Sequence, residues 1–234
     1  MQTGNAVKAI DWASVEEGLD AAPYACLGRL LSAAQIKKLI ASYDDDSAFR
    51  STITMARYNF GRGEYRYFAR PLPDVVAKLR NELYPPLARI ANRWAGRLGS
   101  PRYPKTHKAL TAKCAAAGQT RPTPLILRYG ESDYNCLHKD LYGDVIFPLQ
   151  VVVLLSDPDK DFSGGEFVLT EQRPRMQSRA HVVPMRAGEA VVFAVNERPV
   201  EGRRGYYRTK VRHGVSKVRC GQRYAFGVIF HDAV

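Results

Sequence analysis

The sequence lacks the features that would assign it to several common classes of protein. Its 234 residues contain no long apolar run, and a membrane-spanning helix needs about 18 apolar residues or more. The start, MQTGNAVKAIDW, has no basic stretch followed by an apolar block, so no secretory signal is indicated. We therefore predict a cytoplasmic protein that does not enter a membrane. The four cysteines form no C-x-x-C pair, which gives no support to a zinc ribbon or a thioredoxin motif: Cys26, Cys114, Cys136 and Cys220.

No Gly-, Ser- or Pro-rich linker and no low-complexity segment interrupts the chain. A chain of 234 residues is long enough for one sizeable core. We predict a single domain, 1–234, in which residues 1–122 supply helical support and an Arg/aromatic hairpin, and residues 123–234 form a strand-rich core.

Helical spacing of apolar residues dominates the first part. We expect a short helix over residues 11–22 and another after Ser32, which suits the N-cap position before the apolar stripe of residues 36–43. Residues 73–98 predict two helical pieces broken at Pro85-Pro86, because proline removes a backbone donor and clashes with the preceding turn.

A further helix is expected over residues 104–117, with Gly118 as its stop. His107 lies there between two lysines, and we expect it on the surface.

Between these helices, residues 51–70 are β-prone and predict an antiparallel hairpin centred on Gly61-Arg62-Gly63. Aromatic rings stack on bases and guanidinium groups meet phosphates, so the pattern suits single-stranded or flipped-base binding. Ordinary cross-strand packing explains the same residues. Arginines alternate here with aromatic residues: Arg57, Arg62, Arg66 and Arg70 with Tyr58, Phe60, Tyr65, Tyr67 and Phe68.

The segment 125–140, LILRYGESDYNCLHKD, leaves an apolar stretch and ends in His138-x-Asp140. On a strand, residues two apart share a face, so both side chains would enter one cavity. A surface His-Asp pair is the alternative. Downstream, a second candidate ligand, His213, precedes Gly-Val, and Arg223 follows ten residues later. Two histidines and a carboxylate with open positions suit non-haem Fe(II).

These elements together resemble the Fe(II)/2-oxoglutarate-dependent dioxygenases, with a core most similar to the prolyl-hydroxylase-like members. The matching parts occur in family order over roughly residues 123–232: RYG at 128–130, H-x-D at 138–140, FSGGEF at 162–167, GEAVVF at 188–193, HGV at 213–215 and Arg223. The resemblance implies that His138, Asp140 and His213 bind Fe(II), leaving positions for 2-oxoglutarate and O2.

The fold follows from the order of elements. After residue 122 the chain turns to strands, and residues 145–155 are apolar on both faces, as expected of a strand covered by helices on one side and lining a barrel on the other. Helices followed by about eight strands predict an α+β fold. We expect a double-stranded β-helix, or jelly-roll, core with the N-terminal helices packed on one sheet.

The resemblance also implies that a basic residue holds the far carboxylate of 2-oxoglutarate. Arg223 is the candidate, since its planar fork fits a carboxylate bidentately. By strand parity Ala225, Gly227 and Ile229 share its face and leave room for a slender diacid, whereas the aromatic residues of the strand face the other way. Tyr129 resembles the family tyrosine that hydrogen-bonds the same carboxylate.

Three other residues could lie near the metal. We expect His181 to be a strand or loop residue, because it lacks the Gly-Val context and the downstream arginine. His231 falls on the face of Arg223 and could contact substrate, and Cys136 lies two residues before His138.

Net charge is +12, and most of the excess lies in one block: residues 173–223 contain thirteen Lys and Arg but three acidic residues. Such a block suggests a polyanionic partner; a solvated basic face is the alternative. The loop 195–212 precedes His213, and we expect it at the mouth of the iron site, clamping a nucleic-acid backbone. The candidate contacts are Arg203, Arg204, Tyr206, Tyr207, Arg208 and Lys210, with Arg62 and Arg66 from the hairpin.

Two substrate classes follow. The first is alkylated nucleic acid, as for AlkB-type repair enzymes, in which hydroxylation of an N-methyl group gives a hemiaminal that releases formaldehyde. The chain departs from AlkB where Ala225, Gly227 and Ile229 replace further polar and arginine positions. The second class is a protein or amino acid, hydroxylated as by the prolyl hydroxylases. A non-enzymatic nucleic-acid binder is a third and more distant reading, because all the metal ligands are present.

Overall fold

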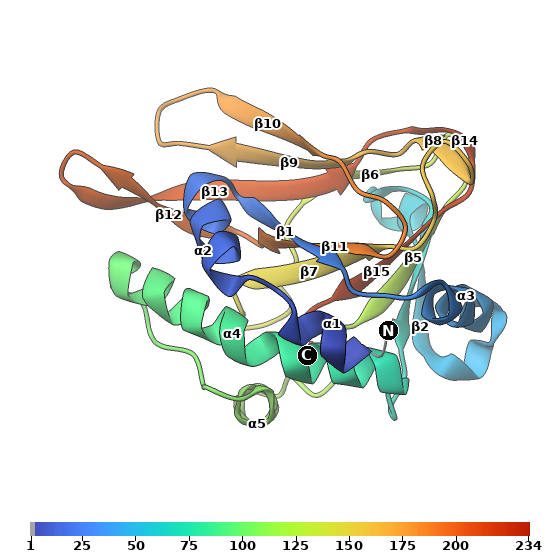
Figure 1. Ribbon diagram of the computed structural model, residues 1–234, viewed down its shortest axis with the longest axis horizontal. Coiled ribbons are helices and arrows are strands. Elements are labelled where there is room, and N and C mark those ends of the chain that lie inside the picture. The colour runs from blue at the N-terminus through green and yellow to red at the C-terminus, as the bar shows by residue number, and fades with distance from the viewer. Residues whose placement is uncertain (1–2) are drawn as a thin grey trace.

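The computed structural model describes residues 3–234. Helices are concentrated in the first half of the chain and strands in the second (Figure 1). The α-helices are α1 (Thr3–Lys8), α2 (Trp12–Ala21), α3 (Ala33–Ala41), α4 (Asp74–Leu98) and α5 (His107–Ala116). Short 3-10 turns occupy Ser42–Asp44, Asp46–Ala48 and Met55–Tyr58.

The strands form two large antiparallel sheets and one small one. The seven-stranded sheet has the order β1-β11-β7-β15-β5-β4-β2, the six-stranded sheet β10-β9-β13-β6-β3 with β12 paired to β13, and the small sheet β14-β8. The strands are β1 (Tyr24–Arg29), β2 (Phe49–Thr54), β3 (Gly61–Arg62), β4 (Glu64–Phe68), β5 (Leu125–Tyr129), β6 (Tyr134–His138), β7 (Leu149–Leu154), β8 (Phe162–Gly164), β9 (Phe167–Gln172), β10 (Ser178–Val183), β11 (Glu189–Ala194), β12 (Glu197–Gly202), β13 (Gly205–Val215), β14 (Val218–Gly221) and β15 (Arg223–Val228).

The molecule is layered. The six-stranded sheet lies over one face of the seven-stranded sheet, and the long helix α4 runs beneath the other face (Figure 1). One contiguous apolar cluster includes residues of the helices and of both sheets. The arrangement confirms the predicted α+β fold with a jelly-roll core and helices on one sheet. Within residues 3–234, no helix combines the length and apolar character needed for a membrane span.

Helix α4 corrects the predicted break at Pro85-Pro86, because it continues through both prolines. Missing donors and ring clashes cost stability inside a helix. However, the neighbours Leu83, Tyr84 and Leu87 are fully buried, so packing on both sides of the prolines holds the helix together.

Shorter elements follow the local signals closely. Helix α2 spans nearly the predicted residues, and Ser32 caps α3 with a capping box to Gln35. Strand β7 is buried along its whole length, as expected of a strand covered on both faces. Helix α5 begins at His107 rather than at residue 104, because Thr106 caps it.

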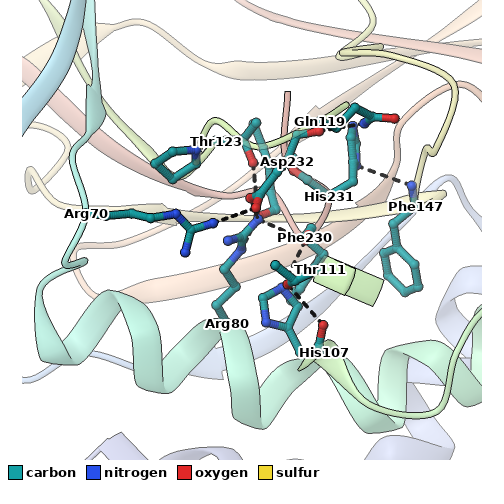
Figure 2. Close-up of polar contacts among 12 residues, drawn as sticks. Arg70, Arg80, His107, Thr111, Gln119, Thr123, Phe147, Phe230, His231 and Asp232 are labelled. Carbon is teal, nitrogen blue, oxygen red and sulfur yellow. Dashed lines mark hydrogen bonds and ion pairs between the residues drawn. The ribbon is translucent and has the colours of Figure 1, made fainter. Parts of the chain in front are cut away.

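His107 is not on the surface as predicted, because its ring packs under the C-terminal segment. Its Nε2 lies 2.9 Å from the carbonyl oxygen of Phe230. In the same region Arg80, from α4, forms a buried ion pair of 2.6 Å with Asp232, which also contacts Arg70 (Figure 2). These contacts hold the C-terminal segment, which follows β15, against helix α4.

The predicted hairpin exists, but its turn is longer than expected. Strand β2 pairs with β4 up to Thr54↔Glu64. The connecting residues 55–63 contain a 3-10 turn and β3, which pairs with β6 of the other sheet. The hairpin therefore reaches from the seven-stranded sheet to the edge of the six-stranded one.

Candidate metal centre

Two adjacent strands of the six-stranded sheet bring the candidate ligands together. His138 ends β6 and lies opposite His213 of β13, and Asp140 follows two residues after His138. One ligand atom from each lies within 4.8 Å of the others. The Nε2 atoms of the histidines lie 3.5 Å (His138) and 3.3 Å (His213) from the Asp140 carboxylate.

The electrostatics of Asp140 and His213 suit a cation. Burial lowers the pKa of His138, but its hydrogen bond with Asp140 outweighs burial and raises that pKa overall. Burial raises the pKa of Asp140, but hydrogen bonds from His138 and His213 outweigh it and hold that pKa well below its usual value. Burial and the neighbouring His138 lower the pKa of His213. An ionised carboxylate and a neutral imidazole are the forms that bind metal.

The orientation of His138 also fits metal binding. Its Nδ1 lies 2.8 Å from the carbonyl oxygen of Cys136 and donates to it, so Nε2 is the ring atom that faces Asp140 and would bind a metal ion. Cys136 thus approaches the site through its backbone, and its side chain is exposed. The donor set, two imidazoles and one carboxylate, therefore fits Fe(II) with open positions.

The other two histidines considered from the sequence lie elsewhere. His181 is in β10, opposite Leu169, and its ring packs edge-on against Tyr24. His231 is buried, accepts a hydrogen bond from the Phe147 backbone and packs against Tyr142, and it does not line the cavity described next. Contact of His231 with substrate stays a prediction.

A cavity of about 180 Å³ between the two sheets contains all three ligand residues. Arg223, Ala225 and Gly227 line one wall, as strand parity predicted. Phe167 and Phe193 pack near His213, whose ring centroid is 4.7 Å from that of Phe193. Apolar walls exclude water and strengthen the electrostatic interactions inside.

Arg223 and Tyr129 lie opposite each other on β15 and β5. The Arg223 guanidinium is 5.6 Å from the centroid of the Tyr129 ring, and both side chains are buried. Burial raises the pKa of Tyr129 to about 12 although Arg223 opposes the shift, so the phenol stays a hydrogen-bond donor. The Nε and Nη1 atoms of Arg223 are buried without a partner. Buried donors require partners, and a carboxylate of 2-oxoglutarate would supply them.

Several residues of the site were not singled out from the sequence. The Tyr142 hydroxyl donates to Asp140, and Asn135 donates to the Tyr129 hydroxyl over 3.3 Å. Lys139 and Gln150 line the cavity, and the Gln150 Oε1 is buried without a partner. Lys139 lies within the H-x-D motif and Tyr142 two residues beyond it, so local signals for both exist, whereas the position of Gln150 depends on how β7 pairs with β11 and β15.

Two exposed aromatic residues lie next to the cavity. Tyr58 and Phe60 stack on each other, with ring centroids 5.5 Å apart and planes at 21°, and they are 54% and 47% exposed. Phe60 also lines the cavity. Leu137 and Leu141, on either side of the H-x-D motif, are 42% and 43% exposed. Tyr58 and Phe60, termed the aromatic rim, therefore begin at the cavity that holds the metal ligands, whereas Leu137 and Leu141 do not line it.

The basic loop predicted to lie at the mouth approaches it only with its last residues, next to His213. It forms the hairpin of β12 and β13, whose tip projects away from the body of the molecule (Figure 1). Arg204 precedes His213 by nine residues, so the tip is on the order of 30 Å away along the strand. None of the six predicted contacts in this hairpin lines the cavity.

Several of the predicted contact residues already have partners in the protein. Arg208 donates to the Leu98 carbonyl and pairs with Glu197, and Tyr206 packs against Arg97. Arg66 is held by Asp46, Glu64 and the Tyr43 carbonyl, because it lies against the 3-10 turns rather than at the mouth. Arg62 is 60% exposed in its side chain and lies 3.8 Å from Asp133.

A jelly-roll that holds two histidines and a carboxylate beside a buried, unpaired arginine defines the class of 2-oxoglutarate/Fe(II)-dependent oxygenases. Residues 63–233 match the Oxygenase-NA family, described as an oxygenase catalysing oxidative methylation of damaged DNA. The chain belongs to this family, and it is an enzyme that uses Fe(II), 2-oxoglutarate and O2.

Proteins of similar sequence and proteins of similar fold are known. An uncharacterised protein of Mycobacterium tuberculosis is 50% identical over 167 residues, which cover 71% of this chain and 72% of the relative. A prolyl-4-hydroxylase of Pseudomonas putida has a similar fold, with a TM-score of 0.54 at 15% identity over 95% of this chain and 100% of that one. A Trichoplax adhaerens prolyl hydroxylase gives 0.58 at 14% identity over 97% and 91%.

Proposed function

We propose that this oxygenase removes N-linked methyl groups from nucleobases in single-stranded or locally unpaired nucleic acid. One atom of O2 enters the methyl C–H bond as a hydroxyl group, and the other enters succinate as 2-oxoglutarate loses CO2. The hydroxymethyl product then breaks its C–N bond, and formaldehyde leaves as the nitrogen regains a proton. The description of the family as acting on damaged DNA supports this substrate class.

The stacked pair Tyr58 and Phe60 carries the proposal. Exposed aromatic rings are costly to leave in water, and a nucleobase can stack on any such ring. Because Phe60 lines the cavity, a base that stacks there would lie at the entrance to the metal ligands. An unpaired base must be presented in this way, since its methyl group cannot be reached inside a duplex.

Residues of the chain have separate roles in this scheme. His138, Asp140 and His213 would hold Fe(II), and Arg223 with Tyr129 would hold the far carboxylate of 2-oxoglutarate. Bound iron and 2-oxoglutarate supply the activation of O2. The apolar walls formed by Leu127, Val152 and Phe193 keep water from the reacting methyl group.

The test compares substrates first. Purified protein with Fe(II), 2-oxoglutarate and ascorbate is given single-stranded oligonucleotides that carry N-methylated bases, and separately a panel of proline-containing peptides. We expect formaldehyde and succinate in equal amounts from the oligonucleotides alone. Hydroxylated peptide without formaldehyde would instead establish the protein-hydroxylase alternative.

Variants then locate the base. Tyr58→Ala with Phe60→Ala should raise KM for the oligonucleotide by about tenfold or more, since each stacked base is worth roughly 1–3 kcal/mol. Tyr206→Ala is the matched control, because it also removes a partly exposed ring but lies near the distal hairpin. A larger increase of KM in the Tyr206 variant would place the base-binding site at the β12–β13 hairpin instead.

A further inference from the structure

Strand β13 presents two different chemistries on its two faces. Thr209, Val211 and His213 are buried, whereas the alternating residues Lys210 and Arg212 are exposed. The strand that carries the distal ligand inside therefore carries cations outside. Successive outward side chains are about 6.6 Å apart, so these cations form a row that begins beside the metal centre.

The row continues to the cavity through Lys139. His213 of β13 lies opposite His138 of β6 in an antiparallel pair. The next residues, Arg212 and Lys139, therefore lie close together across the two strands. Lys139 lines the cavity. The charges of Lys210 and Arg212 both act on Lys139, so three cations gather in one place.

Little in the protein neutralises this row. On β9, Lys210 and Arg212 face the uncharged Gln172 and Thr170. Glu197 lies opposite Lys210 on β12 but already pairs with Arg208 at 3.2 Å. Within the part of the chain that the structure describes, the side chains of Lys139, Lys210 and Arg212 have no hydrogen bond or ion pair. Clustered, unpaired cations are the electrostatic footprint of a polyanion.

We propose that Lys139, Lys210 and Arg212, termed the β13 stripe, bind the phosphate backbone of single-stranded nucleic acid as one of its bases enters the cavity. This rests on the proposed function, and it places the backbone contacts beside the metal centre rather than at the hairpin tip. Phe60 of the aromatic rim and Lys139 of the β13 stripe both line the cavity, so base and phosphates would be held by different side chains on either side of it. An acidic peptide is the competing partner, but it would leave the stacking pair Tyr58 and Phe60 unused.

The experiment uses two variants that change the net charge equally. One is Lys210→Glu with Arg212→Glu, in the stripe. The other is Arg203→Glu with Arg204→Glu, at the hairpin tip. Fluorescence anisotropy measures Kd for a labelled single-stranded oligonucleotide at several salt concentrations, and thermal unfolding checks that both variants fold.

We expect the stripe variant to bind the oligonucleotide at least about tenfold more weakly than the wild type. The plot of log binding constant against log salt concentration should also have a slope shallower by about 1.4, because two phosphate contacts that contribute about 0.7 each are lost. The tip variant should keep the wild-type slope. Lys210→Arg with Arg212→Lys should restore affinity, since the charges remain. Equal weakening by both variants, or an unchanged slope in the stripe variant, would overturn the proposal.

Failure of the stripe and failure of the proposed function give different results. If wild-type protein releases formaldehyde from methylated oligonucleotides while the stripe variant keeps its affinity, the proposed function is supported and the proposed role of the stripe is refuted. If no methylated oligonucleotide is a substrate but the stripe variant loses affinity, the role of the stripe in nucleic-acid binding is supported and the demethylase reaction is refuted. Binding of a poly-glutamate peptide as tightly as the oligonucleotide would assign the stripe to acidic proteins.

Discussion

The hydroxyl group of Tyr142 donates a hydrogen bond of 2.6 Å to Oδ1 of Asp140. Tyr142 is held in place by edge-on contact with Tyr67 and by the ring of His231. Burial, with Asp140 nearby, keeps the pKa of Tyr142 well above its usual value, so the hydroxyl remains protonated and remains a donor. The tyrosine therefore orients a candidate metal ligand from outside the ligand set.

Tyr142→Phe should weaken metal binding while leaving the fold intact, because the ring contacts survive and only the hydroxyl is lost. Loss of such an outer hydrogen bond typically costs about 10–100-fold in metal affinity or activity. Titration of the protein with Mn(II), followed by calorimetry, measures the effect without turnover. Tyr84→Phe is the control, since its hydroxyl donates to the Pro104 carbonyl and not to Asp140; equal losses in both variants would indicate a packing effect.

The three candidate ligands are tested by removal. His138→Ala, Asp140→Ala and His213→Ala should each abolish Fe(II)-dependent turnover of 2-oxoglutarate, because two remaining ligands cannot hold the ion in an open site. His181→Ala should retain turnover, since that ring lies against Tyr24 in β10. Turnover in His213→Ala together with an inactive His181→Ala would show that the distal ligand was misassigned.

Arg223→Ala should raise KM for 2-oxoglutarate by at least about a hundredfold, since stripping a buried carboxylate of its partner costs about 3–5 kcal/mol. Arg223→Lys should recover only part of the loss, because the bidentate fork is absent. Initial rates of succinate formation against 2-oxoglutarate concentration give both KM values. An unchanged KM in Arg223→Ala would move the cosubstrate to another part of the cavity.

How much of this site the sequence predicts depends on how far each signal extends along the chain. Strand parity is local, so the H-x-D pair and the face shared by Arg223, Ala225 and Gly227 follow from the sequence. The rim of Tyr58 and Phe60 does not, because it reaches the cavity through the pairing of β3 with β6. Composition shows that a segment is basic but not where it lies, and the β12–β13 hairpin accordingly projects away from the predicted mouth.

Tertiary packing explains the remaining differences in the fold. Proline predicts a break in the helical turn that contains it. Helix α4 nevertheless continues, because apolar residues on both sides of Pro85 are buried against the rest of the protein. His107 lies between two lysines in the sequence, which suggests a surface position. Its burial depends on the Phe230 carbonyl, 123 residues later, and no local pattern encodes that contact.

His231 makes stability depend on pH. Its Nδ1 accepts a hydrogen bond from the Phe147 backbone, and burial lowers its pKa to about 4 from an ordinary value of 6.5. Between pH 6.5 and 4 the unfolded chain binds a proton at this residue that the folded protein does not, so the stabilisation is present above pH 6.5 and is lost as pH falls through this window.

Urea unfolding at pH 7 and pH 4.5 measures this loss. For His231 alone it amounts to about 1.4 kcal/mol per pH unit within the window. His231→Gln should lower stability at pH 7 but show a smaller decrease toward pH 4.5, because no proton is taken up at that position on unfolding. His181→Gln, at a partly exposed ring, serves as the control and should keep most of the wild-type decrease. If His231→Gln loses stability between the two pH values as steeply as the wild type, His231 is charged in the folded protein and the hydrogen bond from Phe147 is not made.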